Sequence, residues 1–218
     1  MKKETYPKLK ALIILSVFSI NIYAQGGLQL RKCISQLESA KTLDELLSSE
    51  QNFLNLVNEG KKLHHAYYYV SLNNLYLANI DTMRTEDYCL RADKYLHKLD
   101  SISPNNSEVY VLLAMCATAK INVDKAKRAL KLGPAANKLS DRAIAINQNN
   151  PRAYLSKARI VMITPPKLAG GPKFALKHYQ KALEKYKTFE PLDDTEPNWG
   201  EAEAKKELEE CKSKLKMK

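Results

Sequence analysis

Apolar residues recur at three- and four-residue intervals along nearly the whole chain, and no stretch alternates for long between apolar and polar positions. The first pattern is typical of amphipathic helices, whereas sustained alternation would indicate strands. Glycine, which often marks turns, is rare at 7 of 218 residues. The chain is therefore predicted to be all-α.

The helical pattern also repeats. Three stretches, HHAYYYVSL, SEVYVLLAM and PRAYLSKAR, each place a small residue four positions after a tyrosine, and these tyrosines lie 43 and 44 residues apart. A second helix follows each stretch. It carries a repeated pattern at positions i, i+4 and i+7, counted from an alanine, and these positions lie along one helix face. The tyrosines are Tyr67, Tyr110 and Tyr154, and the alanines are Ala92, Ala136 and Ala175. Such helix pairs cannot bury their apolar faces alone, so they stack.

We predict a right-handed stack of antiparallel helix pairs in a single domain, residues 25–218. The expected elements are one or two N-terminal helices (about 28–58), three pairs (about 61–104, 105–148 and 149–190) and a capping helix (197–216). Trp199 is expected to begin the cap and to anchor it against the third pair. A charged outer face is expected of a terminal element, and EAEAKKELEECKSKLK provides one.

The spacing resembles that of tetratricopeptide repeats, whose first helix carries a large aromatic residue and then a small one. RAIAINQNNPRAY and KLDSISPNNSEVY look like the turns between such repeats. More specifically, NNPRAY, TPPKLAGG, ALKHYQKALEKY and EPNWG together resemble secreted repeat proteins of the Bacteroidetes type. The resemblance covers roughly residues 43–216. It implies a TPR-like α-solenoid, and the resembling proteins are largely uncharacterised in function.

The usual tetratricopeptide period is about 34 residues, so each repeat here is expected to hold an insert between its two helices. The expected inserts are residues 81–87, 121–134 and 164–171. The last one runs into Gly-Gly-Pro-Lys, which superficially looks like a phosphate loop. A P-loop follows a strand and has Ser or Thr after its lysine, whereas here a helix precedes, Pro172 lacks an N–H and no hydroxyl follows Lys173. The segment is predicted to turn the chain, with Pro172 in the first turn of the next helix.

Residues 1–24 look like a signal peptide. Four lysines precede the apolar run ALIILSVFSI, and Ala24 is a small residue at the expected cleavage point. The run is shorter than the roughly 20 residues that span a bilayer, and no later segment is apolar enough to do so. The mature chain is expected to be periplasmic or secreted, with no membrane span.

The formal net charge of +11 can indicate a protein that binds nucleic acid, an anionic surface or an acidic partner. Export argues against nucleic acid, and most basic residues alternate with acidic ones, which is typical of a solvated helix face. The identity of the partner and the oligomeric state are not predicted.

No catalytic, metal or cofactor site is predicted. His64 and His65 are adjacent, so their rings diverge around a helix, and the other two histidines are isolated. No serine or cysteine has a recognisable base partner. Four cysteines permit three disulfide pairings that sequence cannot choose between, and for Cys116 a buried free thiol is the favoured interpretation. They are Cys33, Cys89, Cys116 and Cys211.

The candidate binding residues form a row on the first helices of the pairs. Successive residues of Tyr67-Tyr68-Tyr69 lie about 100° apart around a helix, so not all three can be core. With Tyr67 assigned to packing, Tyr68 falls on the face that lines a concave groove. The predicted row consists of Tyr68, Tyr76, Glu108, Met115, Arg152, Arg159 and Met162. Aromatic residues, methionine and arginine are enriched at binding surfaces. The alternative, that the N-terminal segment or the C-terminal helix covers this face, stays open.

The sequence favours a non-catalytic exported scaffold that binds a protein or peptide through the groove or the inserts. The second hypothesis is a ligand-binding accessory protein of an envelope transport system, which would need a closed pocket beneath the inserts rather than an open groove. The third, an enzyme, would need polar residues that converge in a cleft.

Overall fold

The computed structural model describes residues 26–216, and the regular structure in this range is helical throughout. A helix over residues 26–39 precedes the labelled elements. These are α2 (Leu43–Asn58), α3 (Leu63–Ile80), η1 (Thr82–Arg84), α4 (Thr85–Ile102), α5 (Ser107–Val123), α6 (Lys125–Ile146), α7 (Pro151–Ile163), η2 (Pro166–Leu168), α8 (Pro172–Tyr186) and α9 (Glu201–Lys216). The all-α prediction is confirmed.

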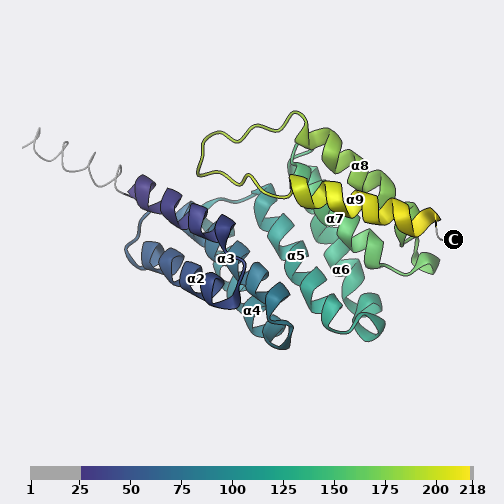
Figure 1. Cartoon of the computed structure of the whole chain (residues 1–218), viewed down its shortest axis with the longest axis horizontal. Helices are drawn as coiled ribbons and strands as arrows, with labels where there is room; N and C mark the ends of the chain where they lie inside the picture. Colours follow the sequence, from purple (N-terminus) through teal and green to yellow (C-terminus); the bar gives the residue numbers. More distant parts are fainter. Residues whose placement is uncertain (1–25, 217–218) are drawn as a thin grey trace, which may run out of the picture.

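Consecutive helices pack in pairs, and the pairs stack side by side (Figure 1). α3 packs on α4, α5 on α6 and α7 on α8, while α4 touches α5 and α6 touches α7. The first helices of the pairs, α3, α5 and α7, also contact one another in that order. We call the surface that these three helices share the inner face. α9 packs on α8 and caps the stack, as predicted.

Alanines on the predicted stripes allow close approach between the helices of each pair. Ala92, Ala136 and Ala175 are completely buried, as is Ala158 on α7. The hydroxyl of Ser71 donates a hydrogen bond across the first pair to the Ala92 carbonyl oxygen, at 3.2 Å. A larger side chain at any of these positions would force the helices apart.

The second expected insert, residues 121–134, is not a loop, which corrects the sequence prediction. Asp124 alone separates α5 from α6, and its side chain caps α6. Pro134 lies inside α6, where it removes one backbone hydrogen bond. Ala129, on the same stretch, is buried in a small apolar cluster, and this packing keeps the stretch helical. The first expected insert, residues 81–87, is likewise mostly helical, as η1 and the first turn of α4.

The third insert, residues 164–171, is a turn between α7 and α8. Gly171 has φ of 86°, a left-handed conformation that glycine adopts without strain. A side chain at Gly170 would overlap the Thr164 carbonyl oxygen. Pro172 is the first residue of α8, where its missing N–H has no helical partner to lose.

The N-terminal part consists of the helix over residues 26–39 and of α2, which packs on α3. The predicted signal peptide, residues 1–24, lies outside the described residues. Between residues 26 and 216, none of the helices combines the length and hydropathy needed to cross a membrane.

Candidate functional site

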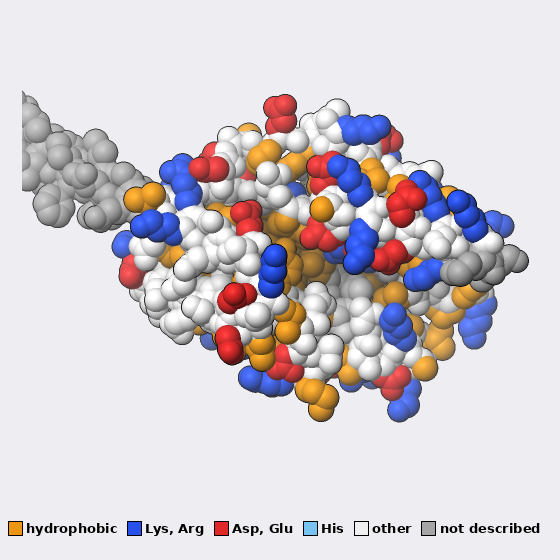
Figure 2. All heavy atoms as spheres, in the orientation of Figure 1, with side chains coloured by type: hydrophobic (Ala, Val, Ile, Leu, Met, Phe, Trp, Pro, Cys, Tyr) orange, Lys and Arg blue, Asp and Glu red, His pale blue; other side chains and the backbone are white. Residues whose placement is uncertain are grey.

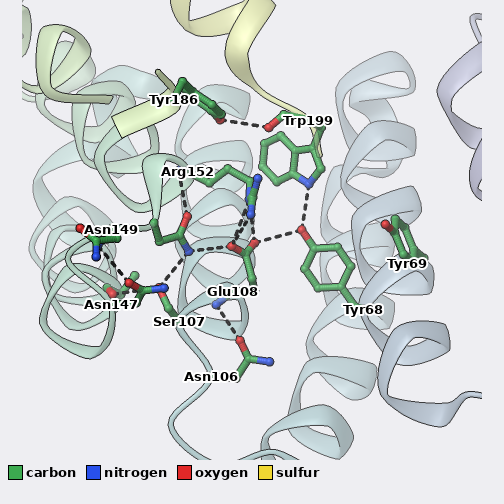
Figure 3. A network of polar contacts seen from close by, with 12 residues as sticks. Tyr68, Tyr69, Asn106, Ser107, Glu108, Asn147, Asn149, Arg152, Tyr186 and Trp199 are labelled. Carbon is green, nitrogen blue, oxygen red and sulfur yellow. Dashed lines mark hydrogen bonds and ion pairs between the residues drawn. The ribbon is translucent and has the colours of Figure 1, made fainter. Parts of the chain in front are cut away.

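A buried polar network joins α3, α5 and α7 on the inner face (Figure 3). Arg152, at the start of α7, places its Nε 3.0 and 3.1 Å from the two carboxylate oxygens of Glu108 on α5. Tyr68 on α3 donates its hydroxyl hydrogen to Glu108 Oε2 at 3.1 Å. Side chains from the first and third helix pairs therefore meet at the Glu108 carboxylate of the second pair. All three residues belong to the predicted groove row.

Two asparagine caps set the positions of the ion pair. Asn106 caps α5 by accepting a hydrogen bond from the Glu108 N–H, and Asn150 caps α7 by accepting one from the Arg152 N–H, each at 2.9 Å. Asparagine is among the preferred residues at this position. The Asn150 side chain also donates to Glu108 Oε1 at 2.6 Å. Each cap thus fixes the first turn that carries one member of the pair.

The segment between α8 and α9, residues 187–200, crosses the inner face, and we call it the strap (Figure 1). Its Trp199 donates the indole N–H to the Tyr68 hydroxyl oxygen at 2.8 Å (Figure 3). The Arg152 guanidinium lies 4.6 Å from the ring centre of Phe189 and 5.7 Å from that of Trp199, within cation–π distance. In this part of the groove the chain's own strap covers the inner face.

Gly200 gives the strap its entry into α9. It has φ of 103°, and a side chain there would overlap the hydroxyl oxygen of Tyr186. That hydroxyl donates to the Trp199 carbonyl oxygen at 3.0 Å. Trp199 was expected to begin the cap and to anchor it against the third pair, but α9 begins at Glu201 and Trp199 belongs to the strap. The structure adds a contact with Tyr68 of the first pair, because the strap spans the whole stack.

Further contacts tie the strap to the N-terminal half of the stack. They are the Tyr69 hydroxyl to the Thr195 carbonyl oxygen at 3.0 Å, His65 Nε2 to Glu196 Oε1 at 3.1 Å, and Arg31 Nε to Asp194 Oδ1 at 2.7 Å. The last pair is exposed and adds little stability. The first is buried, and it holds the strap directly on α3.

Burial governs the protonation of the network. Desolvation by itself would lower the pKa of Arg152, but the charge and hydrogen bonds of Glu108 outweigh it and raise that pKa above its ordinary value. Burial and then the Glu108 charge raise the pKa of Tyr68 well above its ordinary value. The network is a closed ion pair with a neutral phenol.

Next to the strap, a hollow of about 420 Å³ lies between α3, α5, α7 and α9, and we call it the main hollow. This volume falls within the range typical of small-molecule sites. Tyr76, Met115, Met162, Tyr179 and Trp199 supply much of its apolar and aromatic lining. Figure 2 shows this side of the molecule hollowed near its middle, with hydrophobic side chains inside and charged ones around them.

An ion pair closes the α7–α9 side of the main hollow. Arg159 on α7 places Nε 3.0 Å and Nη2 2.6 Å from Glu207 Oε1 on α9. Tyr179 donates its hydroxyl hydrogen to the other carboxylate oxygen at 3.2 Å. Burial would lower the pKa of Arg159, but Glu207 outweighs it and raises that pKa. The guanidinium is already matched within the protein.

A second and larger hollow, of about 620 Å³, adjoins the main hollow. Tyr69, Leu72, Tyr186 and Phe189 line it. The two hollows share Tyr76, Trp199 and Glu203, so they adjoin along the same face.

The structure divides the predicted groove row into two sets. Tyr76, Met115, Arg159 and Met162 line the main hollow. Tyr68, Glu108 and Arg152 form the buried network beneath the strap. The groove is thus covered at one end and hollow at the other, and a binding role for either set stays a prediction.

Sequence reasoning missed three residues of the main hollow: Trp199 as its inner wall, Tyr179 and Glu207. The repeat stripe did single out Tyr179, but as a packing residue of α8. Glu207 comes from the cap, and nothing in its local pattern indicates a partner on α7. Glu207 reaches the site because α9 folds back along the third pair.

Other chemistry is sparse in residues 26–216. Histidine, cysteine, aspartate and glutamate do not gather there in groups of three that could hold a metal ion. The four cysteines are free and buried. Cys89 and Cys116 lie close together, and each Sγ approaches the other residue's carbonyl oxygen, at 3.6 and 4.0 Å.

Comparisons with known proteins identify a structural relative. No family model matches the chain, and no curated protein matches it. Among solved structures, the HusA haemophore from Porphyromonas gingivalis is similar, with a TM-score of 0.77 and 26% sequence identity. The match covers 85% of this chain and 92% of that one. The chain is therefore similar over most of its length to a protein described as a haemophore.

Proposed function

We propose that this protein is an exported, non-catalytic binding protein that holds a flat, largely apolar ligand of the haem class in the main hollow. The observation that carries the proposal is the hollow itself, whose aromatic and thioether side chains come from α3, α5, α7, α8 and the strap. The similarity to a haemophore names the ligand class. The proposal includes a TPR-like solenoid fold. It also includes export by way of a signal peptide, residues 1–24, and action in the periplasm or outside the cell.

The lining suits such a ligand. Flat aromatic ligands gain most of their affinity from apolar contact, and apolar pockets with a few polar groups are the usual form of small-molecule sites. Met115 and Met162 line the same hollow, and methionine is one of the side chains that ligate haem iron. Burial raises the pKa of Tyr76 and of Tyr179, so both phenols stay neutral and present apolar rings.

A peptide in the groove has less support. The strap already covers the half of the inner face where Tyr68 and Arg152 lie, and their polar groups are matched inside the protein. The accessory-protein hypothesis called for a closed pocket beneath the inserts. The main hollow supports the ligand-binding part of that hypothesis, but it is open at its outer end.

The chain carries its own reporter for the test, because Trp199 is its one tryptophan and lines the main hollow. Haemin added to the mature chain, residues 25–218, should quench Trp199 fluorescence and shift the haemin Soret band with the same saturation curve. Tyr76→Ala and Met162→Ala should each weaken haemin binding by about 3- to 30-fold, since each removes apolar contact. Thr118→Phe, which fills the hollow from α5, should weaken it further.

Met83→Ala is the matched control for Met162→Ala, since Met83 is 93% exposed and lies outside the main hollow. Melting temperatures should accompany every titration, so that a folding defect is recognised. Absence of saturable quenching in the wild-type protein would refute the proposed function. Equal effects of Met83→Ala and Met162→Ala would refute the main hollow as the site.

A further inference from the structure

The main hollow changes character along its length. Its inner end, beside the strap, is aromatic. At its outer end are residues from the last turns of the inner helices, among them Asn79 of α3 and Asn122 of α5. Lys125, the first residue of α6, and Lys214, near the end of α9, lie there too. These four side chains are exposed, so the outer end is the mouth of the hollow.

The two lysines are the charges available at this mouth. Between residues 26 and 216, neither Lys125 nor Lys214 lies within ion-pair distance of a carboxylate. Of the acidic residues of the lining, Glu207 is matched by Arg159. Glu210, one turn before Lys214, has only an exposed contact with Lys206 at 4.0 Å, so the two lysines are opposed by this one carboxylate.

One further carboxylate lines the main hollow, that of Glu203. It is on the first turn of α9, near Trp199 at the inner end, and it borders the second hollow as well. The mouth is therefore locally basic, while the inner end is not.

Helix ends do not supply this positive charge. α5 ends and α6 begins on either side of Asp124, so the negative end of one helix dipole adjoins the positive end of the other. These two ends offset each other, and the C-terminal ends of α3, α7 and α9, which also lie at the hollow, add negative rather than positive potential. Positive potential there depends on the lysine ammonium groups, and the amides of Asn79 and Asn122 add hydrogen-bond donors.

We infer that the main hollow selects a ligand with a carboxylate edge: the apolar body enters first, and Lys125 and Lys214 bind the carboxylates at the mouth. The inference rests on the proposed function and adds the chemical class and orientation of the ligand. An amphiphilic tetrapyrrole whose acidic groups lie on one side has this form. The arrangement keeps the carboxylates hydrated at the rim, so burying the apolar body does not require burying charge.

The test compares haemin with haemin dimethyl ester, which keeps the apolar body but has no carboxylate. Wild-type protein should bind the diacid more tightly than the diester. The double variant Lys125→Ala/Lys214→Ala should weaken diacid binding by about 2- to 30-fold, the effect of losing two exposed ion pairs. It should leave diester binding unchanged, and raised salt should reduce the wild-type preference for the diacid.

Lys127→Ala/Lys212→Ala is the matched control. Both lysines are on the same two helices, but they pair with Asp124 and Glu209 and do not line the main hollow. This control should bind both ligands as the wild type does.

The outcomes separate the inference from the proposed function. A wild-type protein that binds neither ligand refutes the function. If the wild-type protein binds both ligands and the lysine variant still prefers the diacid, the inferred recognition of carboxylates is refuted. The proposed function is unaffected by that result. If the lysine variant loses diacid and diester equally, the lysines act on the fold rather than on carboxylates, and the inference is wrong. The charge-reversed variant Lys125→Glu/Lys214→Glu should bind the diester better than the diacid, and the opposite order would also overturn the inference.

Discussion

Replacing Arg152 with methionine tests whether the covered half of the groove stabilises the fold rather than binding a ligand. The Arg152 side chain is 3% exposed and that of Glu108 is 14% exposed. Removing one partner of a buried ion pair costs about 3–5 kcal/mol, because the other charge stays buried without compensation. Here Tyr68 and Asn150 would still donate to Glu108. We therefore expect the lower end, about 3 kcal/mol, in the free energy of unfolding.

Glu108→Gln removes the other charge, and the double variant Arg152→Met/Glu108→Gln removes both. Because the double variant leaves no buried charge behind, it should be more stable than the sum of the single changes predicts, by about 2 kcal/mol of coupling. Arg142→Met is the control, since Arg142 is an exposed arginine on α6, and it should cost less than about 0.5 kcal/mol.

Urea unfolding followed by far-UV circular dichroism and by Trp199 emission measures these free energies. A loss of about 3 kcal/mol corresponds to a melting temperature lower by about 6–12 °C for a chain of this size. Additive single effects, or a cost of Arg152→Met below about 1 kcal/mol, would refute the reasoning. The arginine would then be free to serve a ligand, as the sequence first suggested.

Three further predictions concern other parts of the fold. Burial, together with nearby lysine ammonium groups, lowers the pKa of His178 to about 4. Its neutral form therefore stabilises the fold above the unfolded pKa of about 6.5, and this contribution is lost as pH falls toward 4. His178→Asn should flatten the fall in stability between those pH values, and an unchanged slope in urea unfolding would contradict this. Ala136→Trp and Ala158→Trp should each destabilise by more than the usual overpacking cost of about 1–3 kcal/mol, and unchanged melting temperatures would refute the proposed helix contacts. Cys89 and Cys116 should resist alkylation until the protein is denatured, as intact mass would show, and rapid native labelling would contradict their burial.

Much of the fold could be predicted because each helix pair has a recognisable pattern within its own stretch of sequence. Alanines at 92, 136 and 175 mark close contacts whose partners are the preceding helix, so the pattern and the packing coincide. Pro134 was misleading. The rule that proline ends a helix holds when nothing else acts, but burial of Ala129 in its cluster keeps α6 continuous.

The site was predictable only in part, for a physical reason. Helix phase placed Tyr76 and Met162 on one face because they belong to equivalent helices. The strap has no periodicity, and Trp199 meets Tyr68 across 131 positions of sequence. Nothing local in either segment encodes that contact. Which groove residues would face a hollow and which would be covered therefore could not be read from the pattern.

The strap has a consequence for how the molecule unfolds. In an open solenoid each repeat touches only its neighbours, so terminal repeats can fray independently. Here Trp199 and Thr195 bind α3, while Tyr186 holds the same segment to the end of α8. The strap thereby converts a linear array into a closed ring of contacts in which the first pair cannot open without releasing the third. The chain should accordingly melt as one cooperative unit, and cutting the strap should divide that single transition into two.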